Sequence, residues 1–346
     1  MHLFDYSFLK KTVPTEIVST AMVVTDLRAK EELRKIYGKS TLEILREKAV
    51  IESVRDSNAI EGIVTTEERL RDIVGGDKPV THSEQEISGY RDALNLIHTQ
   101  YESMDVSDEL IKRLHSMITS ETTPARAGKY KTADNRIIEI DESGKRCIRF
   151  TPVPADETEE AMEQFLLAYY DACQDDRIPA LLLIPCVVLD FLCIHPFFDG
   201  NGRISRLITL LLMYENGYDI GRYISVERMI ARYKDAYYSS LAESSKGWHD
   251  NKSDYIPFVI FFLQILYRCY KELDDCFMDE SLMGAKKNER IEIVLMNSIV
   301  PISKSEVLEK LPDVSVRTVE AVLRRLRQEK KIKKIGANKN ARYIKV

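Results

Sequence analysis

Residues 189–206 read Leu-Asp-Phe-Leu-Cys-Ile-His-Pro-Phe-Phe-Asp-Gly-Asn-Gly-Arg-Ile-Ser-Arg, and this stretch decides how the rest of the chain is interpreted. An apolar run, 181–194, leads to His195, and a second run with leucines at helical spacing begins at 204. Gly200 and Gly202, in the loop between them, permit positive φ and close approach of a ligand to the backbone. In such a loop, the N–H groups at the start of the following helix are free and point toward a ligand. The loop therefore predicts an anion site, most often for phosphate.

The side chains around this loop suit the same ligand. Arg203 and Arg206 are three residues apart, so on a helix they share a face and can reach phosphate oxygens together. Asp199 can hold Mg²⁺, which prefers one or two carboxylates plus substrate phosphates. His195 has an ordinary pKa near neutrality and can accept a proton from an attacking hydroxyl. Singly, a histidine before proline and a Gly-Asn-Gly turn are common structural features; together they predict a nucleotidyl or phosphoryl transfer centre.

The segment His195 to Arg206 resembles the signature of the Fic family (filamentation induced by cyclic AMP). It fills every position of the pattern His-Pro-Phe-x-Asp/Glu-Gly-Asn-Gly-Arg-x-x-Arg. The resemblance covers roughly 10–275 and implies transfer of AMP from ATP to a Ser, Thr or Tyr hydroxyl of a protein. It implies these roles: His195 as the base, Asp199 for Mg²⁺, Gly200, Asn201 and Gly202 for phosphate oxygens, and Arg203 and Arg206 for the β- and γ-phosphates.

Gly202 separates two branches of that family. In the phosphate-transferring branch, which resembles the Doc toxin, lysine stands at this position and narrows the anion site. Gly202 leaves room for a full triphosphate, so AMP transfer is favoured over phosphate transfer.

A second motif lies at the end of a predicted helix, 41–60. Ser57 and Glu61 are four residues apart and share a face just before Gly62, and without context this is a solvated helix end. The Fic resemblance gives it a role, because many members carry an inhibitory helix with the pattern Ser/Thr-x-x-x-Glu-Gly/Asn. In them this glutamate pairs with the second arginine of the signature, here Arg206. A carboxylate there repels the γ-phosphate, so Glu61 would be a built-in brake.

Residues 136–150 alternate as a β-hairpin does, with a turn at 142–145. A surface hairpin with no special role is one interpretation. The Fic resemblance implies instead a flap, about 132–154, that pairs with the backbone of the target protein by strand addition. The residues expected to dock the target are Ile137, Ile138 and Glu139.

Composition is that of a water-soluble globular protein, with 44% hydrophobic and 30% charged residues among 346. The sequence predicts no membrane span and no signal peptide. Six cysteines without metal-ligand spacing indicate free thiols in a reducing compartment, so we expect a cytoplasmic protein.

Charged residues are unevenly distributed along the chain. Residues 286–346 contain 16 Lys and Arg against 7 Asp and Glu, whereas the whole chain has a net charge of −5. This basic segment resembles a winged helix-turn-helix, with helices at 291–299 and 303–311, a third capped by Ser315, and strands at 332–335 and 341–346. Such a unit binds DNA through phosphates and a recognition helix, or it keeps the fold as a protein-docking module.

The sequence therefore predicts a mainly α-helical protein with a Fic-type core, a small β-hairpin flap and a C-terminal winged helix-turn-helix. The expected domains are 1–105 with the inhibitory helix, 106–279 as the catalytic core, and 286–346. The expected partners are ATP with Mg²⁺, a target protein and DNA, and the chain is compatible with a homodimer. Two alternatives stay open: removal of AMP from a modified protein, with Glu61 positioning water, and a nucleotide-sensing regulator that binds DNA.

Overall fold

The structure is a computed structural model and describes residues 2–11, 13–37, 39–140, 146–282, 287–298, 301–336 and 341–346. It divides into two compact units, Met1–Lys271 and Glu272–Val346. The boundary falls inside one long helix, and the division of unit 1 that we expect near residue 105 stays a prediction.

Unit 1 is built mainly of helices, as predicted. They are α1 (Thr15–Tyr37), α2 (Lys39–Ile60), α3 (Glu67–Val74), α4 (His82–Gln100), α5 (Asp108–Thr119), α6 (Thr158–Cys173), α7 (Ala180–Ile194), α8 (Asn201–Glu215), α9 (Val226–Arg232), α10 (Lys234–Ser244) and α11 (Ile256–Leu282), which continues into unit 2. None of these described helices is both long and apolar enough to cross a bilayer.

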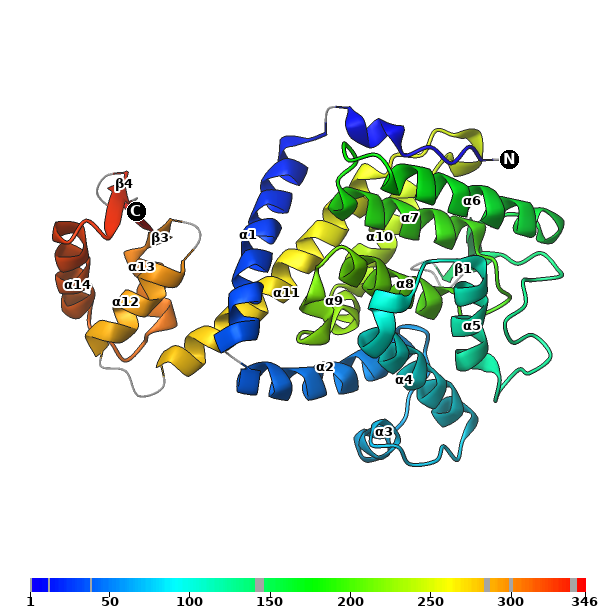
Figure 1. Cartoon of the computed structure of the whole chain (residues 1–346), viewed down its shortest axis with the longest axis horizontal. Helices are drawn as coiled ribbons and strands as arrows, with labels where there is room; N and C mark the ends of the chain where they lie inside the picture. The colour runs from blue at the N-terminus through cyan, green and yellow to red at the C-terminus, as the bar shows by residue number, and fades with distance from the viewer. Residues whose placement is uncertain are drawn as a thin grey trace. The chain divides into compact units, whose positions relative to one another are not determined.

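The two apolar runs beside the glycine loop become α7 and α8, at the centre of unit 1. Both are buried along almost their whole length, which explains why neither alternates between polar and apolar residues. α8 packs against α7, α4 and α5 (Figure 1). The loop between α7 and α8 is therefore held between two rigid helices, which is how a scaffold positions a functional site.

A buried carboxylate fixes the middle of α7. Asp190 accepts hydrogen bonds from Trp248 Nε1 and Tyr255 Oη, both at 2.7 Å, and from Tyr6 Oη at 2.9 Å. Burial raises the pKa of Asp190 to about 6. These bonds join the start of the chain and the entry to α11 to the helix that delivers His195.

α2 has the buried stripe that its sequence predicts. Leu42, Leu45, Ala49 and Val54 are all at most 8% exposed. The helix ends where Gly62 adopts a φ of +81°, a conformation that favours glycine. Its last carbonyl, on Ile60, accepts a hydrogen bond from Lys234 Nζ at 3.0 Å.

The predicted hairpin forms from β1 (Ile137–Ile140) and β2 (Arg146–Phe150), which pair antiparallel. Ile138 lies opposite Ile148 and Glu139 opposite Cys147, with an irregularity between Ile137 and Ile138. The turn expected at 142–145 lies outside the described residues.

The sequence of 225–244 has a helical pattern throughout and predicts one helix, but the structure has two, α9 and α10. Between them Tyr233 leaves the helical region with φ −114° and ψ 36°. The sequence has no glycine or proline there to signal the break.

Unit 2 contains the C-terminal end of α11, then α12 (Lys287–Asn297), β3 (Ile302–Ser303), α13 (Lys304–Lys310), α14 (Val316–Gln328), β4 (Ile332–Ile335) and β5 (Arg342–Lys345) (Figure 1). The strands form an antiparallel sheet in the order β3-β5-β4. Ser303 and Ser315 cap α13 and α14. A single cluster of buried aliphatic residues from all three helices and the sheet forms its core. This order of helices and strands is compatible with the expected winged helix-turn-helix, which stays a prediction.

Candidate functional site

The cavity at the α7–α8 loop has a volume of about 720 Å³, the size of a nucleotide pocket. Its wall brings together His195 from the loop, Gly202 and Arg206 from α8, and Glu61 from the end of α2. Tyr237 and Tyr238 of α10 line another side, with apolar neighbours that suit a base or ribose.

His195 is set up as a neutral base. It adopts the left-handed conformation with φ 52°, and its N–H donates to Phe191 O at 2.9 Å. Its Nδ1 lies 3.2 Å from Leu192 O, and since a carbonyl only accepts, Nδ1 carries the proton and Nε2 has the free lone pair. Burial lowers the pKa of His195 to about 4. At neutral pH the ring is therefore uncharged and able to take a proton.

The start of α8 offers unpaired backbone donors. Its N-cap is Gly200, with φ +79° and no side chain to cap the helix. The first-turn amides of α8 are thus available for an anion. Asn201 holds the loop closed, because its Oδ1 accepts from Phe197 N at 2.9 Å and its Nδ2 donates to Phe197 O at 2.8 Å. The structure thus uses the Asn201 side chain to shape the loop, and its role in phosphate binding stays a prediction.

The position over these amides is taken by Glu61. A Cβ placed on Gly202 would lie 2.2 Å from Glu61 Oε1, so the carboxylate packs directly on the glycine. The same oxygen accepts from Arg206 Nη2 at 2.9 Å. Arg206 is 3% exposed on its side chain and also donates to Ser57, from Nε to Oγ and from Nη2 to the carbonyl, each at 2.8 Å. Ser57 and Glu61 thus meet Arg206 as expected, and their inhibitory role stays a prediction.

Arg203 lies elsewhere. Its side chain is 1% exposed, and its Nη1 is 2.5 Å from Glu86 Oε2 on α4. It is absent from the wall of the cavity. The structure therefore separates the two arginines that sequence spacing placed together, and direct contact of Arg203 with phosphate stays a prediction.

Asp199 is exposed and is not among the residues that line the cavity. Its Oδ1 accepts the Gly200 N–H at 2.7 Å, which leaves the second oxygen for a ligand. Among the described residues, the acidic cluster with metal-ligand spacing is Glu31, Glu32 and Asp219, and it does not include Asp199. A single carboxylate with one free oxygen fits Mg²⁺ that takes its other ligands from phosphates and water.

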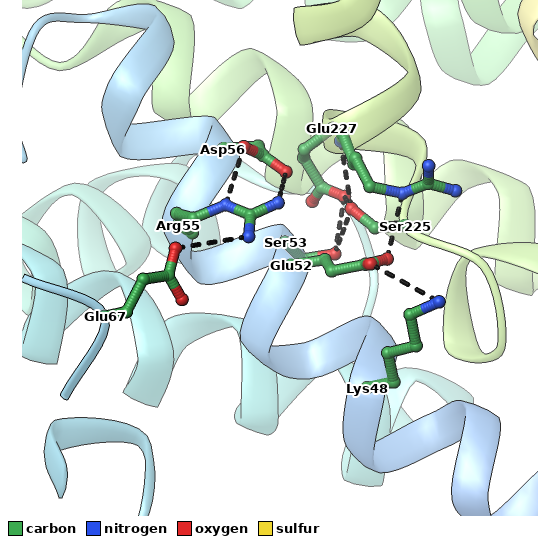
Figure 2. Close-up of polar contacts among 9 residues, drawn as sticks. Lys48, Glu52, Ser53, Arg55, Asp56, Glu67, Ser225 and Glu227 are labelled. Carbon is green, nitrogen blue, oxygen red and sulfur yellow. Dashed lines mark hydrogen bonds and ion pairs between the residues drawn. The ribbon is translucent and has the colours of Figure 1, made fainter. Parts of the chain in front are cut away.

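A polar network fixes the position of α2, and with it the position of Glu61 next to α8. Figure 2 shows Ser53 of α2 directed at Ser225 and Glu227, with Ser53 Oγ 2.8 Å from each. Glu227 is 1% exposed and also accepts from Tyr90 Oη at 3.1 Å. Around this centre, Glu52 pairs with Arg228 at 2.9 Å.

Sequence reasoning missed the residues that brace the loop from behind. Lys131 Nζ donates to Ile194 O at 3.2 Å, and its backbone N–H donates to Pro196 O at 2.9 Å. Asn135 Nδ2 donates to Phe197 O at 3.2 Å. Burial lowers the pKa of Lys131 to about 8. These residues lie just before the hairpin, so one segment clamps three carbonyls around His195.

His115 braces the other side of the loop. It stacks on Phe197 with ring centroids 3.8 Å apart, donates from Nε2 to Asp199 O and accepts the Gly128 N–H on Nδ1. Burial lowers its pKa to about 4, which agrees with a structural role for a neutral ring. No local sequence signal marks these contacts, because they form between segments distant in the chain.

The hairpin forms part of the cavity wall through Ile137 and Ile138, together with Arg136 and Arg149. Ile138 remains 55% exposed, which leaves it accessible to a docking segment. Glu139 is placed by its backbone register alone. The role of Ile137, Ile138 and Glu139 in docking a target stays a prediction.

The segment that contains His195 and the glycine loop is similar to known proteins. Residues 105–213 match the model of the Fic/DOC family. Protein adenylyltransferase Fic of Nematostella vectensis is 24% identical over 257 residues, which are 70% of this chain and 52% of that protein. Protein adenylyltransferase fic-1 of Caenorhabditis briggsae is 30% identical over 128 residues, 36% of this chain and 22% of that protein. The chain thus spans about half or less of each relative.

The fold has solved counterparts. A Fic family protein from Desulfovibrio desulfuricans G20 aligns over 97% of both chains with a TM-score of 0.63 and 20% identity. The aligned range includes both units of the present chain, so the similarity of fold extends beyond the segment around the loop.

Proposed function

Because the chain contains a domain of the Fic/DOC family, we propose that it transfers AMP from ATP to a hydroxyl of a protein and that Glu61 restrains this activity. The observation that carries the proposal is the position of the Glu61 carboxylate. It lies against Gly202 and Arg206 in the cavity that also contains His195. The base His195 thus lies in the same cavity as an anion site, and the carboxylate of Glu61 occupies that anion site.

In the proposed reaction, His195 Nε2 takes the proton of a Ser, Thr or Tyr hydroxyl. The hydroxyl oxygen then bonds to the α-phosphorus of ATP as the bond to pyrophosphate breaks. The amides at the start of α8 and Arg206 stabilise the negative charge of the phosphates. Arg203 adds positive charge behind the loop. The hairpin residues Ile137, Ile138 and Glu139 align the target segment, so positioning and charge supply most of the rate gain.

Asp199 is the residue proposed to hold Mg²⁺, through its free carboxylate oxygen. The ion supplies neutralisation of phosphate charge when it is bound.

Glu61 restrains the reaction by occupying the anion site. Its charge repels the γ-phosphate, and its bond to Arg206 removes the cation that would neutralise that phosphate. Removing the carboxylate frees the Gly202 amide and Arg206 while leaving His195 in place.

The test is incubation with α-labelled ATP and Mg²⁺. We expect weak self-labelling of the wild type, labelling stronger by roughly tenfold or more for Glu61→Gly, which corresponds to about 1.4 kcal/mol of relieved repulsion, and none for Glu61→Gly with His195→Ala. Glu68→Gly, a change of an exposed glutamate on α3, is the matched control and should label as the wild type does.

Two outcomes would change the proposal. If Glu61→Gly labels neither itself nor proteins of a cell lysate, AMP transfer is wrong. Release of AMP from a pre-modified protein by the wild type, lost on Glu61→Gly, would then establish removal of AMP with Glu61 positioning the water.

A further inference from the structure

Residues 286–346 of unit 2 have an excess of positive charge, whereas residues 272–285 contain five Asp and Glu and no Lys or Arg. Residues 286–346 contain 16 Lys and Arg against 7 Asp and Glu. An excess of this size on a small unit is typical of proteins that contact a polyanion.

The acidic residues of unit 2 are mostly neutralised by partners within the unit. Asp313 pairs with Arg290 at 2.8 Å, and Glu306 pairs with Arg342 at 3.0 Å. Glu292, Glu320 and Glu329 have ion pairs as well. Pairing therefore uses cations of α12, α13 and β5 together with Arg325 of α14 and Lys331, and it leaves a defined set of cations without an ion pair.

That set lies on α14 and the strands that follow it. The cations without an ion pair to any described carboxylate are Arg317, Arg324 and Arg327 on α14, Lys330 after it, Lys333 and Lys334 on β4, and Lys345 on β5. All of them are exposed. Their charge is free to act on an external ligand.

The exposed face of α14 has the side chains that a recognition helix uses. Val319, Val322, Leu323 and Leu326 are buried and fix one side of the helix in the core of unit 2. The opposite face presents Arg317, Ala321, Arg324 and Gln328 to solvent. Arg317 and Arg324 are seven residues apart, two turns along the same face. Arginine, glutamine and a methyl group are side chains that read the edges of guanine, adenine and thymine.

We propose that unit 2 binds duplex DNA, with the exposed face of α14 in the major groove and the lysines of β4 and β5 on the phosphates. A major groove about 12 Å wide accepts a helix, whereas the deep, narrow major groove of duplex RNA does not. A protein partner fits this face poorly, because protein interfaces have an apolar, charge-depleted centre. Among the described residues of this unit, the exposed large apolar side chains are Val316, Ile335 and Val346.

The test is fluorescence anisotropy of a short labelled DNA duplex of mixed sequence with the full chain at increasing NaCl. With five to seven phosphates neutralised, log Kd should rise against log[NaCl] with a slope of about 4 to 6. Affinity should then fall about a thousandfold between roughly 50 and 200 mM. The binding is independent of AMP transfer, so the labelling activity of unit 1 should be the same in every variant used.

Two matched variants assign the binding to this face. Arg317→Ala with Arg324→Ala should weaken binding by about tenfold or more and lower the salt slope by about 2. The control, Lys287→Ala with Lys310→Ala, removes the same charge from cations that are already paired with Asp313 and Asp275, and it should change binding less than threefold. A thermal melt of each variant shows whether it folds.

Four outcomes overturn the proposal. No anisotropy change at the lowest salt removes DNA binding. Equal losses of DNA affinity in the two folded variants would show that binding depends on net charge and not on α14. Duplex RNA bound as tightly as DNA excludes insertion of α14 in the groove, and binding of a protein through α14 without binding of DNA would identify the unit as a docking module.

Discussion

Helices α8 and α14 both carry arginines, which are buried on α8 and exposed on α14. On α8, Arg206 and Arg203 are buried, and each meets a carboxylate, Glu61 from α2 and Glu86 from α4. On α14, Arg317 and Arg324 are exposed and have no ion pair among the described residues. The same side chain therefore forms two kinds of anion site. At the closed site on α8, an anion can bind only after a carboxylate leaves. At the open site on α14, the binding of an anion depends on ionic strength.

The largest effect that this comparison predicts is on stability, at the closed site. Glu86→Ala leaves Arg203 charged, buried and without its carboxylate, which should cost about 3–5 kcal/mol of unfolding free energy. We expect the melting midpoint of unit 1 to fall by roughly 10 °C. Differential scanning calorimetry measures it.

Glu86→Gln is the control for Glu86→Ala, because it keeps the volume and one carbonyl acceptor near Arg203 and should recover part of the loss. A midpoint unchanged in both variants would show that Arg203 is hydrated or paired elsewhere, and the description of a closed site would then be wrong for α8.

The next effect concerns pH. Because burial lowers the pKa of His195 to about 4, the ring is neutral well below pH 6. Glu61 raises this pKa, so its removal lowers it further. The AMP-transfer rate of Glu61→Gly at pH 5.5 should therefore stay within about twofold of its rate at pH 7, whereas a histidine with an ordinary pKa would lose about tenfold.

A pH–rate profile at saturating ATP checks this, with circular dichroism at each pH to confirm that the protein is folded. A tenfold fall between pH 7 and 5.5 in folded protein would show that His195 titrates near its ordinary pKa. Lys131, which lies behind the loop and lowers the pKa of His195, gives a second test: Lys131→Met should move the acid limb to higher pH.

The two arginine sites also show what a sequence can and cannot predict. The glycine loop between α7 and α8 is local, so its place at the start of a buried helix followed from spacing alone. The Glu61–Arg206 contact spans 145 residues, and only a family resemblance suggested it. The Glu86–Arg203 pair had no such signal, because a glutamate on a helix is usually solvated and its partner depends on how α4 packs on α8. Lys131 escaped notice for the same reason, and the contacts of His115 with the loop had no sequence signal either. The mainly helical fold was predicted because the helices carry local signals, which are apolar residues at helical spacing or, for α7, an almost wholly apolar run.

A smaller effect concerns the hydrogen bond that supports the closed site. Ser57 Oγ accepts from Arg206 Nε at 2.8 Å in the restrained arrangement. Ser57→Ala should destabilise that arrangement by about 1 kcal/mol and raise basal self-labelling roughly fivefold. Ser19→Ala, on an exposed face of α1, is the matched control and should leave labelling unchanged. Labelling equal to the wild type in Ser57→Ala would mean that Glu61 alone restrains Arg206.

The smallest predicted effect is on the stability of the protein, at the open site on α14. Arg324→Ala removes a cation that is exposed and has no ion pair among the described residues, so it should change the unfolding free energy by less than about 0.5 kcal/mol. Chemical denaturation followed by fluorescence measures the difference from the wild type. DNA binding, and not stability, is the property that should respond to the loss of Arg324. A destabilisation as large as that of Glu86→Ala would show that Arg324 is structural, and α14 would then be a second closed site.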